Sequence, residues 1–396
     1  MTNSQGSLER LRETNRLRVI DALRTCGSAS RSDLVELTGL SRTTVTSLLG
    51  ELQSRGLVTA NGEPDHSQRL RGRPPRMIRL APSAGAALGV AFGHSHVHIA
   101  ISDLSSTVLA EGRCELDVDA SASAALDAAL ELVDALLEET GVARSQLVAA
   151  GMGIPGPVAI PSGQVGSSSI LPGWEGLEPA KALAARLDGL HVKALNDANL
   201  GALAEASRGE SDVVYVKVAT GIGAGLVLAG RLHAGISGNA GEIGHVQVRD
   251  GGVACRCGNR GCLETVASVP AVLATLRPAH GDALDVAGVL ELARRGDNAT
   301  TRVLNDAGRA VGRALADLCN VVNPGVIVIG GDLSAAGAPL LDGVRDSIDR
   351  FAQPEAAAAV TVRRSELEPR AEILGALSLV IGDTEWMTSE ALLPHA

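Results

Sequence analysis

The residues best suited to chemistry lie between positions 238 and 264, where three of the six cysteines stand near one histidine and two glutamates. Three thiolates and one imidazole form the ligand set of a closed tetrahedral zinc site. Four protein ligands leave no open position for a reactive water, so we expect a structural zinc ion that shapes a loop. The predicted ligands are His245, Cys255, Cys257 and Cys262, and Gly258 and Gly261 allow the tight turns between them.

Two other interpretations of these cysteines remain open: three reduced thiols in a loop, or one disulfide beside a free thiol. The disulfide is disfavoured because the N-terminus is polar and has no apolar signal region. The cysteine pattern suits metal binding in a reducing compartment. No apolar run approaches the roughly 18 residues of a membrane span. We therefore expect a cytoplasmic protein with no membrane partner.

Further polar residues complete a candidate site. Glu242 and Glu264 flank the metal ligands and are not needed for the metal, so the loop can present them, with His245, to another ligand. Asp197 follows a predicted strand and opens a predicted helix, which places it where α/β sites form. A carboxylate there could take a proton from a sugar hydroxyl, and Asn196 beside it offers amide hydrogen bonds. The local alternative is that these residues only cap the helix.

Charge is divided unevenly along the chain. Residues 1–80 carry a net charge of +5, whereas the remainder carries −15. A basic head on an acidic body is expected where one segment meets nucleic acid. Apolar spacing and caps in the head predict the three helices and two wing strands of a winged helix-turn-helix. They fall at residues 16–23, 30–39, 41–55, 57–59 and 77–80.

Two groups of side chains in this head are candidates for contact with DNA. Four polar residues lie off the apolar stripe near the start of the third helix, where base edges are read. They are Arg42, Thr43, Thr46 and Ser47. The loop between the wing strands holds four arginines in eight residues, and Arg71 and Arg73 among them suit phosphate or minor-groove contact. A helical dimerisation module is the alternative, but such a module needs no basic loop.

The remaining residues alternate between strand and helix patterns, which predicts an α/β body. Glycines follow predicted strands at residues 93, 221–225 and 330–331. Glycine there lets backbone N–H groups approach an anion, although a single such glycine often marks only a turn. Three in one body indicate an ancestral nucleotide cleft.

These residues resemble the ROK family of repressors, open reading frames and sugar kinases. The matching motifs span most of residues 83–396 and include Gly153-Ile-Pro-Gly-Pro157, Leu195-Asn-Asp-Ala-Asn199, Thr220-Gly-Ile-Gly, Gly238–His245, Cys255-x-Cys-Gly-x-x-Gly-Cys-Leu-Glu264 and Asn323-Pro324 with Gly330-Gly331. The resemblance implies an α/β, two-lobe, actin-like body of the sugar-kinase and Hsp70 type behind the winged helix. We expect a DNA-binding domain at 1–82, a first lobe at 83–195 plus 372–396, and a second lobe with the zinc loop at 196–371.

The resemblance also implies that a carbohydrate binds between the lobes. Its hydroxyls would contact Asn196, Asp197, Glu242, His245 and Glu264. Asp197 would be catalytic only if kinase activity were retained. Pro172-Gly173-Trp174 matches a loop that closes over the sugar.

One departure bears on the chemistry. Family kinases open the body with Asp-x-Gly-Gly-Thr-Lys, where this chain has Ala91-Phe92-Gly93-His94-Ser95-His96. The ring of His94 would crowd the backbone that phosphates need to approach. We therefore expect that the protein does not use ATP as a cofactor and is not an enzyme.

Together these features predict a sugar-responsive DNA-binding transcription regulator, and a repressor rather than an activator. It would bind a palindromic double-stranded operator as a homodimer or homotetramer, with a sugar or sugar phosphate as effector. The alternatives are an active ATP-dependent sugar kinase with an appended DNA-binding domain and a zinc-sensing repressor.

Overall fold

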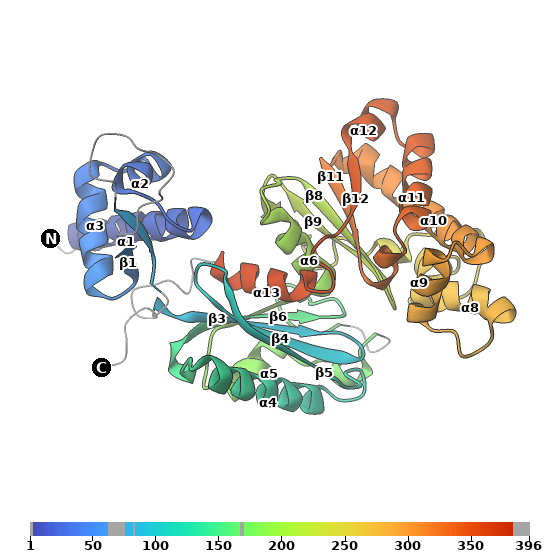
Figure 1. Cartoon of the computed structure of the whole chain (residues 1–396), viewed down its shortest axis with the longest axis horizontal. Coiled ribbons are helices and arrows are strands. Elements are labelled where there is room, and N and C mark those ends of the chain that lie inside the picture. Colours follow the sequence, from blue (N-terminus) through green and yellow to red (C-terminus); the bar gives the residue numbers. More distant parts are fainter. Residues whose placement is uncertain (1–2, 62–75, 82–83, 167–169, 383–396) are drawn as a thin grey trace.

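The computed structural model describes residues 3–61, 76–81, 84–166 and 170–382. Figure 1 shows three parts in a row: an N-terminal winged helix, a first sheet with helices on both faces, and a second sheet with a group of helices beyond it. Among the described residues, no helix has both the length and the apolar character needed to cross a bilayer.

The winged helix is built as the capping residues predict. Helices α1 (Asn3–Cys26), α2 (Arg31–Thr38) and α3 (Arg42–Ser54) precede antiparallel strands β1 (Val58–Asn61) and β2 (Met77–Leu80). Ser30 and Asp33 form the predicted capping box of α2, and Ser41 caps α3. Helix α1 begins at Asn3, well before the predicted Arg16. The prediction starts too late because the polar residues ahead of Arg16 show no apolar period.

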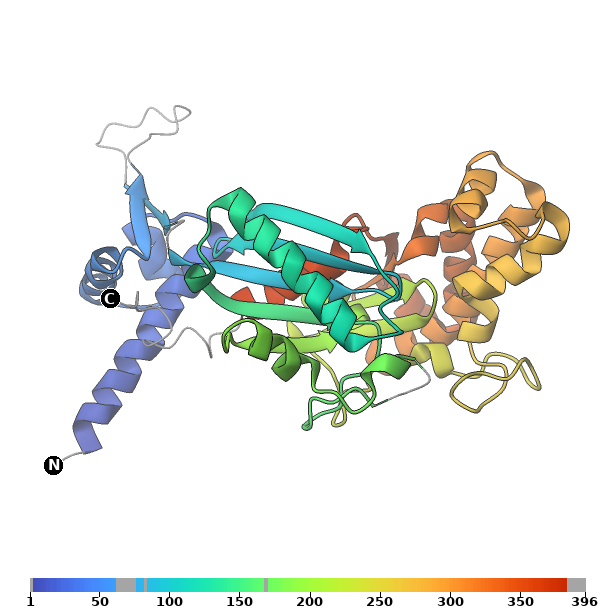
Figure 2. The ribbon, with the colours of Figure 1, turned by 90° about the horizontal axis from the view of Figure 1, so that it is seen from below.

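The first sheet carries one edge of the cleft described below. Its order is β5-β4-β3-β6-β7, with β3 parallel to β6 and antiparallel to β4. The strands are β3 (Ala86–Phe92), β4 (His96–Asp103), β5 (Val108–Glu115), β6 (Leu147–Ile154) and β7 (Val192–Asn196). Helix α4 (Ala122–Thr140) covers one face and α13 (Ala371–Ile381) the other (Figures 1 and 2). Helix α5 (Pro179–Arg186), which packs by β7, was not among the predicted elements.

The second sheet has the order β10-β9-β8-β11-β12. Its strands are β8 (Val213–Val218), β9 (Ile222–Leu228), β10 (Arg231–Leu232), β11 (Val326–Gly330) and β12 (Thr361–Arg364). Strand β9 begins three residues before the predicted Gly225, since pairing with β8 continues through glycines that lack strand propensity. Helix α6 (Asp197–Ala206) packs on this sheet, and the outer helices are α7 (Glu264–Ala267), α8 (Val269–His280), α9 (Val286–Arg294), α10 (Asn298–Val322), α11 (Ala338–Phe351) and α12 (Pro354–Ala359).

Helices α6 and α13 pack against each other between the two sheets. A β-carbon at Gly375 would lie 1.9 Å from the carbonyl oxygen of Leu200, so glycine permits this close approach. The far end of α13 belongs to the same apolar cluster as the winged helix, in which Val380 and Ile381 join Val19 and Leu23. One helix therefore connects the region between the sheets to the DNA-binding head.

Candidate functional site

A cleft opens between the two sheets at the ends of their central strands. All five residues predicted to contact a sugar line it: Asn196, Asp197, Glu242, His245 and Glu264. Asn196 ends β7 and Asp197 begins α6, while the other three belong to the loop and short helical turns that follow β10. The fold thus brings together side chains from distant parts of the chain.

The four predicted metal ligands form one cluster beside the cleft. Their ligand atoms all lie within 4.8 Å of one another. The sulfurs of Cys257 and Cys262 are 3.7 Å apart, and Cys255 Sγ lies 3.5 Å from His245 Nδ1. A tetrahedral zinc site with its usual bond lengths needs roughly 3.8 Å between two sulfurs and roughly 3.6 Å between sulfur and nitrogen. The donor set and spacing therefore fit a tetrahedral metal ion, as the sequence predicts.

Local backbone geometry builds this cluster. Gly261 has a φ of +69°, and a β-carbon there would lie 1.8 Å from the carbonyl oxygen of Arg249. Only glycine fits such a close approach in the left-handed region. His245 turns Nδ1 toward the cysteines, while its Nε2 lies 3.8 Å from Glu242 Oε2 in the cleft. The same ring can therefore hold the metal and position a cleft carboxylate.

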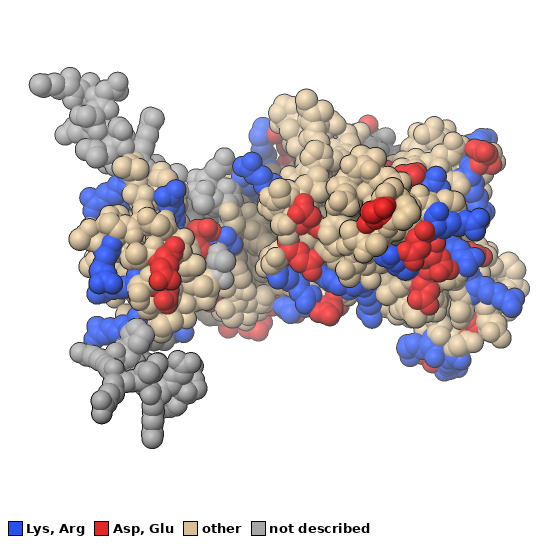
Figure 3. Space-filling model, turned by 90° about the horizontal axis from the view of Figure 1, so that it is seen from above, with Lys and Arg blue, Asp and Glu red and all other residues tan. Residues whose placement is uncertain are grey.

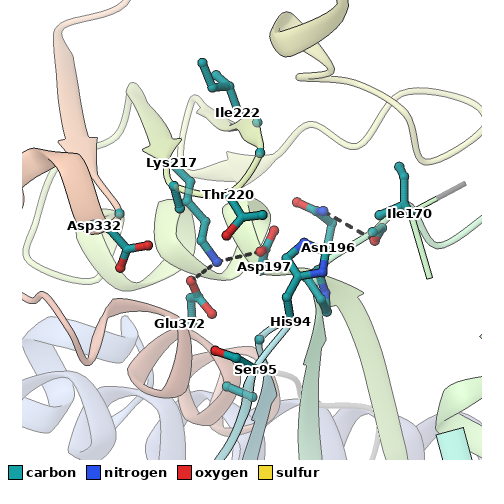
Figure 4. Close-up of a pocket in the computed structure, with 18 of the residues that line it drawn as sticks. His94, Ser95, Ile170, Asn196, Asp197, Lys217, Thr220, Ile222, Asp332 and Glu372 are labelled. Carbon is teal, nitrogen blue, oxygen red and sulfur yellow. Dashed lines mark hydrogen bonds and ion pairs between the residues drawn. The ribbon is translucent and has the colours of Figure 1, made fainter. Parts of the chain in front are cut away.

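An unpredicted lysine occupies the centre of the cleft. Lys217 extends from β8 between Asp197 and Glu372, which lie on α6 and α13 (Figure 4). Its Nζ lies 2.6 Å from Asp197 Oδ2 and forms a second ion pair with Glu372. Burial alone lowers the pKa of Lys217, but the charges of Asp197 and then Glu372 outweigh burial and raise it above its usual value. Lys217 therefore stays charged and holds Asp197 in a salt bridge.

Glu372 makes the stability of this cluster depend on pH. Burial raises the pKa of Glu372 from 4.5 to about 7, against the opposing charge of Lys217. The folded state therefore binds the Glu372 proton more tightly than the unfolded chain does. Stability is lost as the pH rises from the unfolded pKa of 4.5 through the folded pKa of about 7. We expect the free energy of unfolding of the wild type, relative to Glu372→Gln, to fall between about pH 5 and pH 8 in urea titrations. A relative stability that rises over this range would contradict the assignment.

Side chains of the protein itself occupy the glycine-rich turns. The backbone N–H of Gly331 donates to Glu368 Oε1 at 2.9 Å, and that of Ile222 donates to Glu264 Oε2 at 3.3 Å. At Gly93, an added β-carbon would lie 2.2 Å from the ring of His96, so this ring covers the glycine. At each of the three glycine-rich turns predicted to bind an anion, a side chain of the protein thus already covers the glycine or accepts a backbone hydrogen bond.

The comparisons with known proteins agree with this geometry. The ROK family model matches residues 87–383, which is most of the chain. The chain belongs to the ROK family. An IclR helix-turn-helix model matches residues 14–62, ahead of the ROK region.

Two curated relatives and one solved structure match nearly the whole of this chain, including the winged helix. The DNA-binding transcriptional dual regulator NagC of Escherichia coli K12 is 31% identical, covering 95% of this chain and 94% of that protein. The xylose repressor of Caldicellulosiruptor bescii is 26% identical, covering 96% and 98%. The crystal structure of a ROK family transcriptional regulator, homologous to Escherichia coli Mlc, has a TM-score of 0.79 at 24% identity, covering 97% and 99%.

These relatives decide between the two main predictions for this ROK protein. Both curated relatives are transcription regulators, and the match includes the winged helix as well as the body. The chain is therefore a DNA-binding transcription regulator of the ROK family, as the winged helix and the body motifs predict.

Two histidines of the altered phosphate loop, His94 and His96, line the cleft. The sequence predicts that the ring of His94 crowds the phosphate approach. His94 does line the cleft, and its Nδ1 lies 2.8 Å from Asp119 Oδ1. The ring that covers Gly93 belongs to His96, at the position of the kinase lysine. Burial, assisted by Arg113, lowers the pKa of His96 to about 4, so this ring is neutral at pH 7.

The predicted DNA contacts lie on one exposed part of the winged helix. Arg42, Thr43, Thr46 and Ser47 are all exposed on α3, whose buried side packs into the domain core. Figure 3 shows basic side chains on this domain, and the exposed arginines there include Arg31, Arg42 and Arg79. Arg71 and Arg73 lie outside the described residues.

Proposed function

We propose that this chain represses transcription until a carbohydrate binds in the cleft between its two lobes. The first lobe comprises residues 83–195 and 372–396, and the second comprises residues 196–371. The observation that carries the proposal is the convergence of the Asn196 amide with the carboxylates of Asp197, Glu242 and Glu264 on one cavity beside the metal cluster. Carboxylates accept hydrogen bonds from hydroxyl groups and amides both donate and accept them, as a polyol requires. The curated relatives supply the DNA-binding half of the proposal.

Zinc is proposed as the resident metal, with a structural role. His245 and the three cysteines would supply all four bonds of a tetrahedral ion, which leaves no position for substrate or reactive water. When bound, the ion cross-links the loop that carries Glu242 and Glu264. The alternative zinc-sensing repressor requires readily exchanged metal, so retention of zinc through mild chelation with full sugar response would exclude it.

Helix α13 offers a route from the sugar to the operator. Its first turn holds Glu372, which pairs with Lys217 in the cleft, and its last turn packs in the apolar cluster of the winged helix. An effector shifts the equilibrium only if it binds one arrangement of the lobes more tightly than the other. Closure of the lobes on sugar would displace α13 and with it the recognition helices, so that they no longer match the half-sites of a palindromic operator in a homodimer or homotetramer.

The proposal is tested by operator binding with and without sugars. The full chain would first be screened by thermal shift against monosaccharides and their 6-phosphates, since a ligand of the folded state raises the melting point. The stabilising compound should then release the protein from operator DNA. Stabilisation without any change in operator affinity would overturn the sensor role.

The kinase alternative is tested separately. Asp197 favours it, whereas the Lys217 ion pair and the covered Gly93 oppose it. Calorimetry with ATP in the presence of the stabilising sugar should give no heat of nucleotide binding. Nucleotide binding together with a phosphorylated product would restore the kinase alternative.

Arg42→Ala should weaken operator binding by about tenfold, since a base or phosphate contact is worth about 1–3 kcal/mol. If the guanidinium contacts phosphate, the slope of log affinity against log salt should also fall by about one. Fluorescence anisotropy at several salt concentrations measures both quantities. Arg302→Ala, an exposed arginine on α10, is the matched control and should leave both unchanged. If Arg42→Ala and Arg302→Ala had the same operator affinity and the same salt dependence, Arg42 would not contact DNA.

A further inference from the structure

The charges of the cleft distinguish between the two effector classes, an uncharged sugar and a sugar phosphate. We infer that the cleft binds an uncharged sugar and discriminates against its phosphate, because every permanent cation in the described lining already pairs with a carboxylate of the protein. The inference rests on the proposed function, and it narrows the ligand of the same site.

The lining carries more negative than positive charge. Six carboxyl groups line the cleft, at Asp197, Glu242, Glu264, Asp332, Glu368 and Glu372, and all except Glu372, whose pKa is raised to about 7, count as charged at pH 7. Only three permanently charged cations face them among the described lining residues: Lys217, Arg113 and Arg256. Excess negative charge in a partly desolvated cavity repels a phosphate dianion, and salt screens this repulsion less than it would on an open surface.

Lys217 is the cation nearest the centre, and it is fully engaged. Its Nζ is 2.6 Å from Asp197 and also pairs with Glu372, so two carboxylates share one ammonium group. A phosphate that approached Lys217 would have to displace one of these carboxylates or lie beside both. Either arrangement leaves like charges close together, which is unfavourable in a low-dielectric site.

The two arginines are occupied in the same way. Arg256, from the metal loop, lies 2.7 Å from Glu264 Oε2, and that oxygen also accepts the N–H of Ile222. Arg113, at the edge of the first sheet, lies 3.0 Å from Glu115. Both guanidinium groups therefore have a carboxylate partner in the structure, although the Arg113 pair is the more exposed of the two.

Four histidines also line the cleft, and one of them, His245, belongs to the proposed metal ligands. His94 is hydrogen-bonded to Asp119, and His98 lies 3.8 Å from Glu111. His96 covers Gly93, and burial keeps it neutral at pH 7 because its pKa falls to about 4. The N–H of Gly331, another donor suited to phosphate, already binds Glu368. An uncharged sugar needs none of these groups, since its hydroxyls can donate to the carboxylates and accept from Asn196.

The test compares matched pairs on the full chain by calorimetry: glucose with glucose 6-phosphate, and N-acetylglucosamine with its 6-phosphate, with xylose as a further uncharged sugar. We expect at least one uncharged sugar to bind, and to bind about tenfold or more tightly than any phosphorylated partner. A phosphate that binds as tightly as its parent sugar, or more tightly, and releases operator would overturn this inference while leaving the sensor function intact. Failure of every compound to bind would overturn both.

A charge variant tests the stated cause. Glu372→Gln keeps the shape of the side chain but removes an ionisable partner of Lys217, and the comparison is made at pH 8, where the wild-type Glu372, with a pKa of about 7, is mostly charged. The affinity for the phosphorylated sugar should rise several-fold relative to the uncharged one. Glu366→Gln is the matched control, because Glu366 is exposed and pairs with Arg208 away from the cleft lining. If the ratio of affinities does not change in Glu372→Gln, the Lys217 cluster is not what excludes phosphate.

Discussion

Replacing Cys257 by serine is expected to abolish stable metal binding and to weaken the sugar response without removing DNA binding. Cys257 is one of four ligands whose atoms lie within 4.8 Å of one another. Serine is a poor zinc ligand, and loss of a structural metal belongs to the mechanisms that cost about 4 kcal/mol or more. The loop would no longer hold His245 beside Glu242, so the cleft would lose part of its preformed geometry.

Three measurements on the full chain test this prediction. Metal analysis should fall from about one zinc per chain to near zero, thermal unfolding should occur at lower temperature, and sugar affinity should drop more than operator affinity. Cys114→Ser, on β5 of the first sheet, is the matched control and should retain the metal. A Cys257→Ser protein with normal sugar response would show that the metal loop does not form the pocket.

The metal cluster was predictable because its four ligands lie in one short stretch. Their spacing, with glycines at the turns, leaves few other arrangements, and Gly261 has the left-handed conformation that the prediction requires. The caps of α2 and α3 were predictable for the same reason, since Ser30 and Ser41 bond to groups only three residues away. In each case the determining contacts are local in the chain.

Contacts between distant segments were harder to predict. Lys217 pairs with Asp197 on α6 and with Glu372 near the end of the chain, and only the packing of α6 against α13 brings these groups together. A signal was nevertheless present, because a lysine within the apolar strand Val213–Val218 must find a charged partner if it is buried. The placement of the His96 ring over Gly93 carried no such signal. It depends on which way the ring turns where β3 meets β4.

Replacing Glu242 by alanine is expected to give a regulator that binds operator but no longer answers to sugar. Glu242 lines the cleft without belonging to the metal set, and its Oε2 lies 3.8 Å from His245 Nε2. Burial raises the pKa of the Glu242 carboxyl, as expected for an acidic group in a partly desolvated cavity. A hydrogen bond to a charged group is worth about 1.5–3 kcal/mol, which corresponds to roughly a 10- to 150-fold loss of sugar affinity.

The variant separates sensing from DNA binding because Glu242 lies in the cleft and not in the winged helix. Operator affinity without sugar should equal that of the wild type, and the sugar concentration that releases half of the operator should rise by the same factor as the loss of affinity. Glu139→Ala, an exposed change on α4, should alter neither value. If Glu242→Ala released operator at the wild-type sugar concentration, the effector would bind elsewhere. The convergence of carboxylates beside the metal would then need another explanation.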